Sequence, residues 1–320
     1  MELLRVEGLK TYFYTTAGVV KAVDNVSFSL NKGEVLGLAG ESGCGKSTTA
    51  FSIIRLVPPP GRITGGKIIF EGQDILKMSN EEFRKKIRWK KISMIFQGAM
   101  NAFNPVFTIG DQIAEVLILH KGLTKREAIE EVKKLLAMVG IDPKRYRSYP
   151  HELSGGMKQR AMIAMALALN PPLVIADEPT TALDVVVQAQ IMNLMKRLQR
   201  QYKMSIILIT HDLSLIAEIA DKVAIMYAGK IVEFGTAEQI YLNPQHPYTK
   251  GLLASIPRIR GEIRKLEWIP GVPPDLIRPP PGCRFAPRCK YKFEPCDKEE
   301  PPMIEVEKGH YVACWLYTKR

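Results

Sequence analysis

One eight-residue segment constrains the fold of this chain more than any other feature. Residues 40–47 read GESGCGKS and match the pattern G-x-x-x-x-G-K-[ST] at every fixed position. The glycines let successive backbone N–H groups converge on phosphate oxygens, because no Cβ stands in the way. An apolar strand over residues 34–39 precedes the segment, and a helix is predicted to begin at Lys46. The helix N-terminus adds partial positive charge, so the segment predicts a nucleotide-phosphate site rather than a ligand-free turn.

Each position of this phosphate loop has a predicted task. Lys46 is expected to reach the β- and γ-phosphates, and the Ser47 hydroxyl to ligate Mg²⁺. Cys44 lies near a helix N-terminus, which lowers thiol pKa values, but we interpret it as occupying a variable position of the loop. The residues predicted to bind ATP here are Gly40, Ser42, Gly43, Cys44, Gly45, Lys46, Ser47 and Thr48.

A second segment supplies two acidic side chains at the end of an apolar strand. Residues 173–176 are apolar, and Asp177 and Glu178 follow directly. Asp177 is predicted to reach the magnesium ion through water, and Glu178 to act as general base for the attacking water. Two surface acids at a strand end would be the ordinary interpretation, but the phosphate loop favours catalysis.

The order of the predicted elements indicates an α/β domain followed by a different region. Apolar strands over 173–176 and 205–210 flank an amphipathic helix over 184–201, which is a strand–helix–strand crossover. Residues 67–70 suggest an antiparallel edge, and about 98–170 a helical subdomain. More than half of the 22 prolines follow residue 243, and proline breaks regular elements. We therefore predict a domain over 1–242 and a loop-rich appendage over 243–320.

Four further motifs resemble those of the ABC transporter ATPases. Residues 153–157 (LSGGM) resemble the signature loop, and 181–184 (TALD) resemble the D-loop. Gln97 follows an apolar strand as the Q-loop glutamine does, and His211 matches the switch histidine. With the phosphate loop, these motifs occur in the order of that family. The resemblance implies a P-loop ABC ATPase fold, with a mixed sheet, an antiparallel β edge and a helical subdomain.

The resemblance also implies roles for these residues. In that family two ATPase domains enclose two ATP molecules head to tail, so Ser154, Gly155 and Gly156 would serve the nucleotide held by a partner domain. Gln97 would contact Mg²⁺, together with Ser47 and Asp177, and relay to the membrane partner. His211 would hold the γ-phosphate.

An aromatic side chain near the N-terminus is expected to stack on adenine. Phe13 occupies the family's stacking position. Tyr12 and Tyr14 flank Phe13, so the register is open by one residue, and packing against the sheet is the competing interpretation.

The stretch over 153–184 resembles the D-type ATPase subunits of oligopeptide and dipeptide importers more narrowly. Met157 stands where many relatives have Gln, which leaves the serine and glycines intact. Residues 246–249 (HPYT), 270–273 (PGVP) and 282–289 (GCRFAPRC) resemble the C-terminal region of the same subunits. His246 is interpreted as part of a proline-flanked turn, not as a metal ligand. The resemblance implies an F-type ATPase partner, two permease subunits and an extracytoplasmic binding protein.

Four of the five cysteines gather in this C-terminal region. Cys283, Cys289, Cys296 and Cys314 follow the spacing C-x5-C-x6-C-x17-C. Clustered cysteines in a cytosolic chain suggest metal rather than disulfides, but zinc and ferredoxin sites have tighter spacings. Spacing alone leaves an iron–sulfur cluster, Zn²⁺ and no metal open. The family resemblance favours a cluster, of the [4Fe–4S] type, that staples the appendage.

The net charge and hydropathy of the chain are compatible with several functions. No apolar run approaches the ~20 residues of a membrane span, so we expect a peripheral protein at the cytoplasmic face of the membrane. The net charge of +12 suits an ordinary solvated surface, an anionic membrane or nucleic acid. The leading prediction is an ATPase of a peptide importer. The alternatives are a nickel or other small-solute importer and a nucleic-acid-associated ABC ATPase. The last lacks support, because the chain has neither a second ATPase domain nor a stacking platform.

Overall fold

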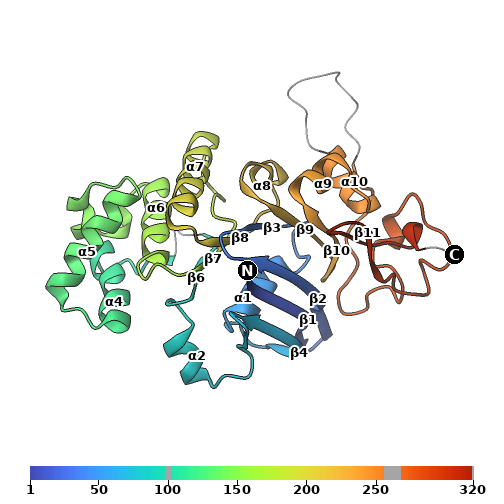
Figure 1. The fold of residues 1–320 in the computed structure, drawn as a ribbon, viewed down its shortest axis with the longest axis horizontal. Coiled ribbons are helices and arrows are strands. Elements are labelled where there is room, and N and C mark those ends of the chain that lie inside the picture. Colours follow the sequence, from blue (N-terminus) through green and yellow to red (C-terminus); the bar gives the residue numbers. More distant parts are fainter. Residues whose placement is uncertain (99–101, 256–267, 319–320) are drawn as a thin grey trace. The chain divides into compact units, whose positions relative to one another are not determined.

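The structure of the chain is a computed structural model that describes residues 1–98, 102–255 and 268–318 (Figure 1). The chain folds into two units. Unit 1 comprises Met1, Asn31–Val35 and Lys77–Ile209, and unit 2 comprises Glu2–Leu30, Leu36–Leu76 and Thr210–Arg320. This partition differs from the predicted boundary at residue 242, so the domains 1–242 and 243–320 stay a prediction about organisation.

Unit 1 contains three parallel strands in the order β8 (Ser205–Ile209), β7 (Leu173–Asp177) and β6 (Ile92–Ile95). Every residue of these strands is buried, as expected for parallel strands covered on both faces. The strands predicted over 173–176 and 205–210 are therefore confirmed. The crossover between them is α7 (Val185–Tyr202), which buries its apolar stripe.

The remaining helices of unit 1 lie between β6 and β7 in the chain, except α2, which precedes β6. They are α2 (Asn80–Lys86), α4 (Ile109–Lys121), α5 (Lys125–Met138), α6 (Gly155–Ala166) and the 3-10 helices η1 (Pro143–Arg147) and η2 (Pro150–Glu152). The side chains of Thr124 and Glu127 cap α5 reciprocally, and its buried residues recur every four positions. Figure 1 shows α4, α5 and α6 grouped together. The described part of the predicted subdomain, about 98–170, is thus mainly helical; residues 99–101 lie outside the described ranges.

Unit 2 contains a mixed sheet and a separate antiparallel sheet. The mixed sheet orders its strands as β11 (Met303–Glu307), β12 (His310–Ala313), β10 (Lys230–Thr236), β9 (Lys222–Tyr227) and β3 (Val35–Ala39). Only β3 and β9 pair in parallel; the other pairs are antiparallel. The second sheet orders β2 (Gly18–Asn31), β1 (Glu2–Thr15), β4 (Gly61–Phe70) and β5 (Gln73–Asp74). The expected mixed sheet and antiparallel edge are therefore both present.

Helix α1 (Lys46–Ile53) follows β3 after the phosphate loop and begins at the predicted residue. The other helices of unit 2 are α8 (Leu213–Ile219), α9 (Ala237–Leu242), α10 (Pro247–Ala254), η3 (Ala286–Arg288) and η4 (Trp315–Tyr317). Within the described ranges, no helix is long and apolar enough to cross a membrane.

The C-terminal region contains a hairpin that was not predicted from the sequence. Strands β11 and β12 form a hairpin, and β12 pairs antiparallel with β10. The alternation of exposed and half-buried residues in β11 and the turn at Gly309, with φ 74°, explain the hairpin. The hairpin begins after Pro302 and is free of proline, whereas the proline-dense described segment 268–302 has few regular elements.

A buried carboxylate ties this hairpin to the remainder of unit 2. Glu233 of β10 is fully buried and contacts His310 Nε2 of β12 at 2.8 Å. The backbone N–H groups of Gln245 and His246 also donate to its two oxygens, at 2.6 and 2.9 Å. A buried carboxylate is tolerated when its acceptors are satisfied in this way.

Candidate nucleotide-binding site

The backbone of the phosphate loop requires glycine at three positions. Gly40, Gly43 and Gly45 have φ values of 150°, 77° and 106°. A Cβ on Gly40 would lie 2.0 Å from the Met226 carbonyl oxygen, and one on Gly45 would lie 2.1 Å from the Ala22 carbonyl oxygen. The loop is thus held against β9 and β2 by close backbone approaches, which leaves its amide groups for a ligand.

The ammonium group of Lys46 donates hydrogen bonds to backbone atoms of the loop itself. Its side chain is 5% exposed, and Nζ donates to the carbonyl oxygens of Gly40, at 2.7 Å, and Glu41, at 3.0 Å. The Cys44 thiol lies 3.6 Å from the same atom, and burial raises its pKa. Cys44 is therefore a buried, protonated side chain.

Two further predicted nucleotide contacts belong to unit 2. Phe13 lies in β1 and is half-buried against Gly61. Tyr12 donates to Asp24 Oδ1 at 2.7 Å, and burial raises its pKa to about 12, whereas Tyr14 is 49% exposed. Tyr12 is thus engaged elsewhere, which leaves Phe13 and Tyr14 as the candidates for stacking. His211 is exposed in the segment between β8 and α8.

Unit 1 brings the predicted base and the Q-loop glutamine together. Glu178 follows β7 with φ 45°, a strained value for a non-glycine residue. Its Oε2 accepts hydrogen bonds from Gln97 Nε2 at 2.8 Å and from Thr181 Oγ1 at 2.9 Å. Asp177, the last residue of β7, is 2% exposed. The sequence did not predict that Gln97 and Thr181 would both hold Glu178.

The signature motif forms an exposed helix N-terminus in unit 1. Ser154 caps α6, accepting from the Met157 backbone N–H at 3.3 Å, and its side chain is exposed. Gly155 and Gly156 form the first turn, and a Cβ on Gly156 would lie 2.8 Å from Val187 Cγ1 of α7. The Asp184 side chain caps α7, accepting from the Val187 backbone N–H at 2.9 Å. A capped, exposed N-terminus with glycine amides can bind an anion.

The four C-terminal cysteines line one small cavity in unit 2. Cys283, Cys289, Cys296 and Cys314 contribute to its wall, with apolar neighbours such as Phe285 and Phe293. All four are free thiols. Burial raises the pKa of Cys283 to about 12 and that of Cys314 to about 11. Among the described residues, no three His, Cys, Asp or Glu side chains are arranged to hold a metal ion, so the structure does not support the expected metal staple.

His246 lies at the wall of the same cavity and is the N-cap of α10, directly before Pro247, rather than part of a turn. Its Nδ1 accepts from the Tyr248 backbone N–H at 3.0 Å and caps α10. Burial lowers its pKa to about 3, so the ring is neutral. Nδ1 is therefore the unprotonated nitrogen and Nε2 carries the hydrogen. That buried Nε2 has no hydrogen-bond partner within the described part of the chain.

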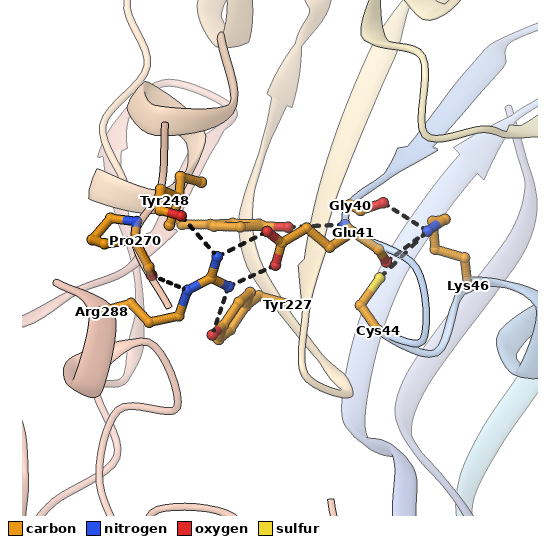
Figure 2. A network of polar contacts seen from close by, with 9 residues as sticks. Gly40, Glu41, Cys44, Lys46, Tyr227, Tyr248, Pro270 and Arg288 are labelled. Carbon is orange, nitrogen blue, oxygen red and sulfur yellow. Dashed lines mark hydrogen bonds and ion pairs between the residues drawn. The ribbon is translucent and has the colours of Figure 1, made fainter. Parts of the chain in front are cut away.

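Sequence reasoning missed a set of contacts between the phosphate loop and the C-terminal region. Glu41 pairs with Arg288, and its backbone N–H donates to Tyr248 Oη at 2.9 Å (Figure 2). Glu41 is an acidic residue in a loop that binds phosphate. Its negative charge is the sequence signal from which a neighbouring cation could have been predicted.

Comparison with known proteins shows which protein families this chain resembles. Residues 23–181 match the family described as ABC transporter, and residues 232–296 match the oligopeptide/dipeptide transporter C-terminal region. The chain is 51% identical to the dipeptide transport ATP-binding protein DppD of Bacillus subtilis, covering 100% of this chain and 96% of that protein. It is 49% identical to the oligopeptide transport ATP-binding protein OppD of Escherichia coli, covering 98% and 93%.

Solved structures with a similar fold belong to the same class of ATP-binding proteins. A dimeric ATP-binding cassette bound to ADP and phosphate aligns with a TM-score of 0.66 at 26% identity, covering 73% of this chain and 99% of that one. The cbiO1 protein of Clostridium perfringens, part of a transporter complex, aligns with a TM-score of 0.65 at 26% identity, covering 76% and 91%. The fold and the phosphate loop thus define an ABC-type ATPase. The chain belongs to the ATP-binding proteins of the oligopeptide/dipeptide ABC transporters.

Proposed function

We propose that this chain hydrolyses ATP to drive import of dipeptides or oligopeptides, as a peripheral subunit on the cytoplasmic face of the membrane. The observation that carries this proposal is the presence, in one chain, of a formed phosphate loop and a peptide-transporter C-terminal region that contacts it. The proposed partners are an F-type ATPase, two permease subunits and an extracytoplasmic peptide-binding protein.

The proposed chemistry assigns one task to each predicted residue. The loop from Gly40 to Thr48 and the Lys46 ammonium bind the phosphates, and Phe13 stacks on adenine. Glu178 accepts a proton from the attacking water, and its carboxylate is oriented by Gln97. His211 contacts the γ-phosphate.

Magnesium fits the available donors. Ser47, Gln97 and Asp177 are the proposed contributors, and Mg²⁺ normally uses few protein ligands together with waters and phosphate oxygens. The lack of a three-residue cluster among the described side chains is therefore compatible with this ion, which would supply charge neutralisation of the phosphates.

The signature loop of each ATPase is proposed to act on the nucleotide of its partner. Ser154, Gly155 and Gly156 lie at the N-terminus of α6, where Ser154 is exposed and the two glycines are half-buried. This arrangement supports a head-to-tail pair in which the second chain supplies the phosphate loop.

A transport measurement tests the substrate. We expect vesicles that contain this chain and its partner subunits to accumulate labelled peptides only when ATP is inside the vesicle on the ATPase side. Vesicles with Lys46→Ala should show background uptake. Uptake of nickel instead of peptide would support the small-solute alternative. Salt-resistant binding of DNA by the purified chain would support the nucleic-acid alternative.

A [4Fe–4S] cluster is the proposed occupant of the cysteine cavity. Four thiols in one apolar cavity match the donor set of such a cluster, and each would ligate a different iron. The unpaired Nε2–H of His246 at the same wall suits a sulfur acceptor. Zn²⁺, which binds thiolates at about 2.3 Å, is the alternative occupant of the same four side chains. The cluster would supply a cross-link between the segment 283–296 and Cys314.

Metal analysis of the anaerobically purified chain tests the cluster. We expect a brown protein with about four iron and four sulfide per chain, both strongly reduced in Cys289→Ser. Cys44→Ser is the matched control, because Cys44 lies in the phosphate loop rather than at the cavity, and it should keep the full content. A colourless chain loaded with zinc, or without metal, would contradict the proposal.

A further inference from the structure

The second residue of the phosphate loop carries a charge that opposes its ligand. Glu41 lies between Gly40 and Ser42, and its side chain is 28% exposed. A carboxylate at this position repels the phosphates of ATP, and a partly desolvated site strengthens that repulsion. ATP binding is therefore favoured only if this charge is neutralised or held away.

Arg288 neutralises Glu41 from the C-terminal region. Its Nη1 and Nη2 donate to the two carboxylate oxygens at 2.7 and 3.0 Å, a bidentate pair (Figure 2). Arg288 is 8% exposed. This residue belongs to η3, directly before Cys289.

The arginine is itself held in one orientation. Its Nε donates to the Pro270 carbonyl oxygen at 2.8 Å, and its guanidinium lies 5.7 Å from the centre of the Tyr227 ring. The hydrogen bonds to Glu41, ahead of the opposing effect of burial, raise the pKa of Arg288, so it stays charged at every pH where the protein is folded. A rigid guanidinium thus fixes the direction of the carboxylate.

The same region also holds the backbone of the loop. Tyr248 of α10 is buried and accepts from the Glu41 N–H at 2.9 Å, while the Glu41 carbonyl oxygen accepts from Lys46 Nζ. Glu41 is therefore joined to the C-terminal region at its side chain and its backbone, and to the phosphate-binding lysine at its carbonyl group (Figure 2).

We propose that Arg288 is a positioning residue for ATP, which makes nucleotide affinity depend on docking of the C-terminal region against the phosphate loop. The guanidinium cancels the charge of Glu41 and keeps the carboxylate away from the incoming phosphates. The proposal rests on the proposed role of this loop in ATP binding and does not require an occupant in the cysteine cavity.

Paired substitutions separate this role from simple support of the fold. We expect Arg288→Ala to raise the Kd for ATP about tenfold at low salt, because an unpaired carboxylate then faces the phosphates. The double variant Arg288→Ala with Glu41→Gln should return to within about threefold of the wild type, since the repelling charge is gone. Higher salt should shrink the defect of the single variant, because screening weakens repulsion.

Controls keep each outcome interpretable. Lys292→Ala removes an equal charge from the same region, at an exposed pair with Asp297, and should bind ATP as the wild type does. Arg288→Gln replaces Arg288→Ala if thermal unfolding shows that the latter is not folded. An unchanged Kd in the single variant, or a defect that Glu41→Gln fails to rescue, would overturn the proposal. A wild-type chain that binds no ATP would instead overturn the proposed function itself.

Discussion

The Glu178→Gln variant should bind ATP nearly as well as the wild type but hydrolyse it about a thousandfold more slowly, the usual size of a general-base contribution. The amide keeps the shape of the carboxylate and can still accept from Gln97 or Thr181, which hold Glu178 Oε2 at 2.8 and 2.9 Å. It loses the basicity needed to take a proton from water. The substitution should therefore abolish general-base catalysis of ATP hydrolysis and preserve ATP binding.

Steady-state ATPase rates and the association state with ATP measure this result. Slow hydrolysis should also accumulate the ATP-bound pair, visible as a dimer by size-exclusion chromatography. Glu131→Gln is the control, because Glu131 lies in α5, its side chain is 42% exposed and it pairs with Lys134 at the surface. Turnover equal to the wild type would remove Glu178 from the role of base.

The Lys46→Ala variant should lose ATP binding almost completely. Lys46 is 5% exposed, and two carbonyl oxygens of the loop accept from its ammonium, so it is pre-positioned for phosphate. Removing a buried, hydrogen-bonded cation costs about 3 kcal/mol of affinity, or roughly a hundredfold in Kd. Hydrolysis should fall with binding, which distinguishes this variant from Glu178→Gln.

Calorimetric titration and thermal unfolding with and without ATP provide the measurement. ATP should raise the melting temperature of the wild type, because it binds only the folded state, and should leave Lys46→Ala unshifted. Lys67→Ala is the matched control: Lys67 lies in β4 of the same unit, is 59% exposed and meets Glu7 at 4.0 Å. An ATP-induced shift of wild-type size in Lys46→Ala would contradict the assigned role.

Local patterns predicted the parts of this protein whose neighbours are close in sequence. The phosphate loop, its strand and its helix are continuous in the chain, so the order of these elements follows from residues 34–53. The buried strand before Asp177 was equally visible, because parallel strands covered on both faces are uniformly apolar.

Contacts between segments that are distant in the chain could not be predicted from such local patterns. The pair of Glu41 and Arg288 joins positions 247 residues apart, and Gln97 meets Glu178 across 81 residues. The periodicity of the sequence does not indicate which distant residues meet, because loop closure and tertiary packing determine these contacts. The β11–β12 hairpin was locally encoded by alternation and a glycine turn, but the surrounding prolines obscured it.

The buried Glu233 makes the ATPase core and the C-terminal region thermodynamically inseparable. Glu233 is 0% exposed in the intact chain, and a chain cut after residue 242 would lose the three groups that satisfy it: His310 and the backbone donors of Gln245 and His246. It would also uncover the edge of β10 that β12 now occupies, and unpaired strand edges promote aggregation. Exchanging C-terminal regions between relatives would therefore succeed only when this carboxylate and its donors are transferred together.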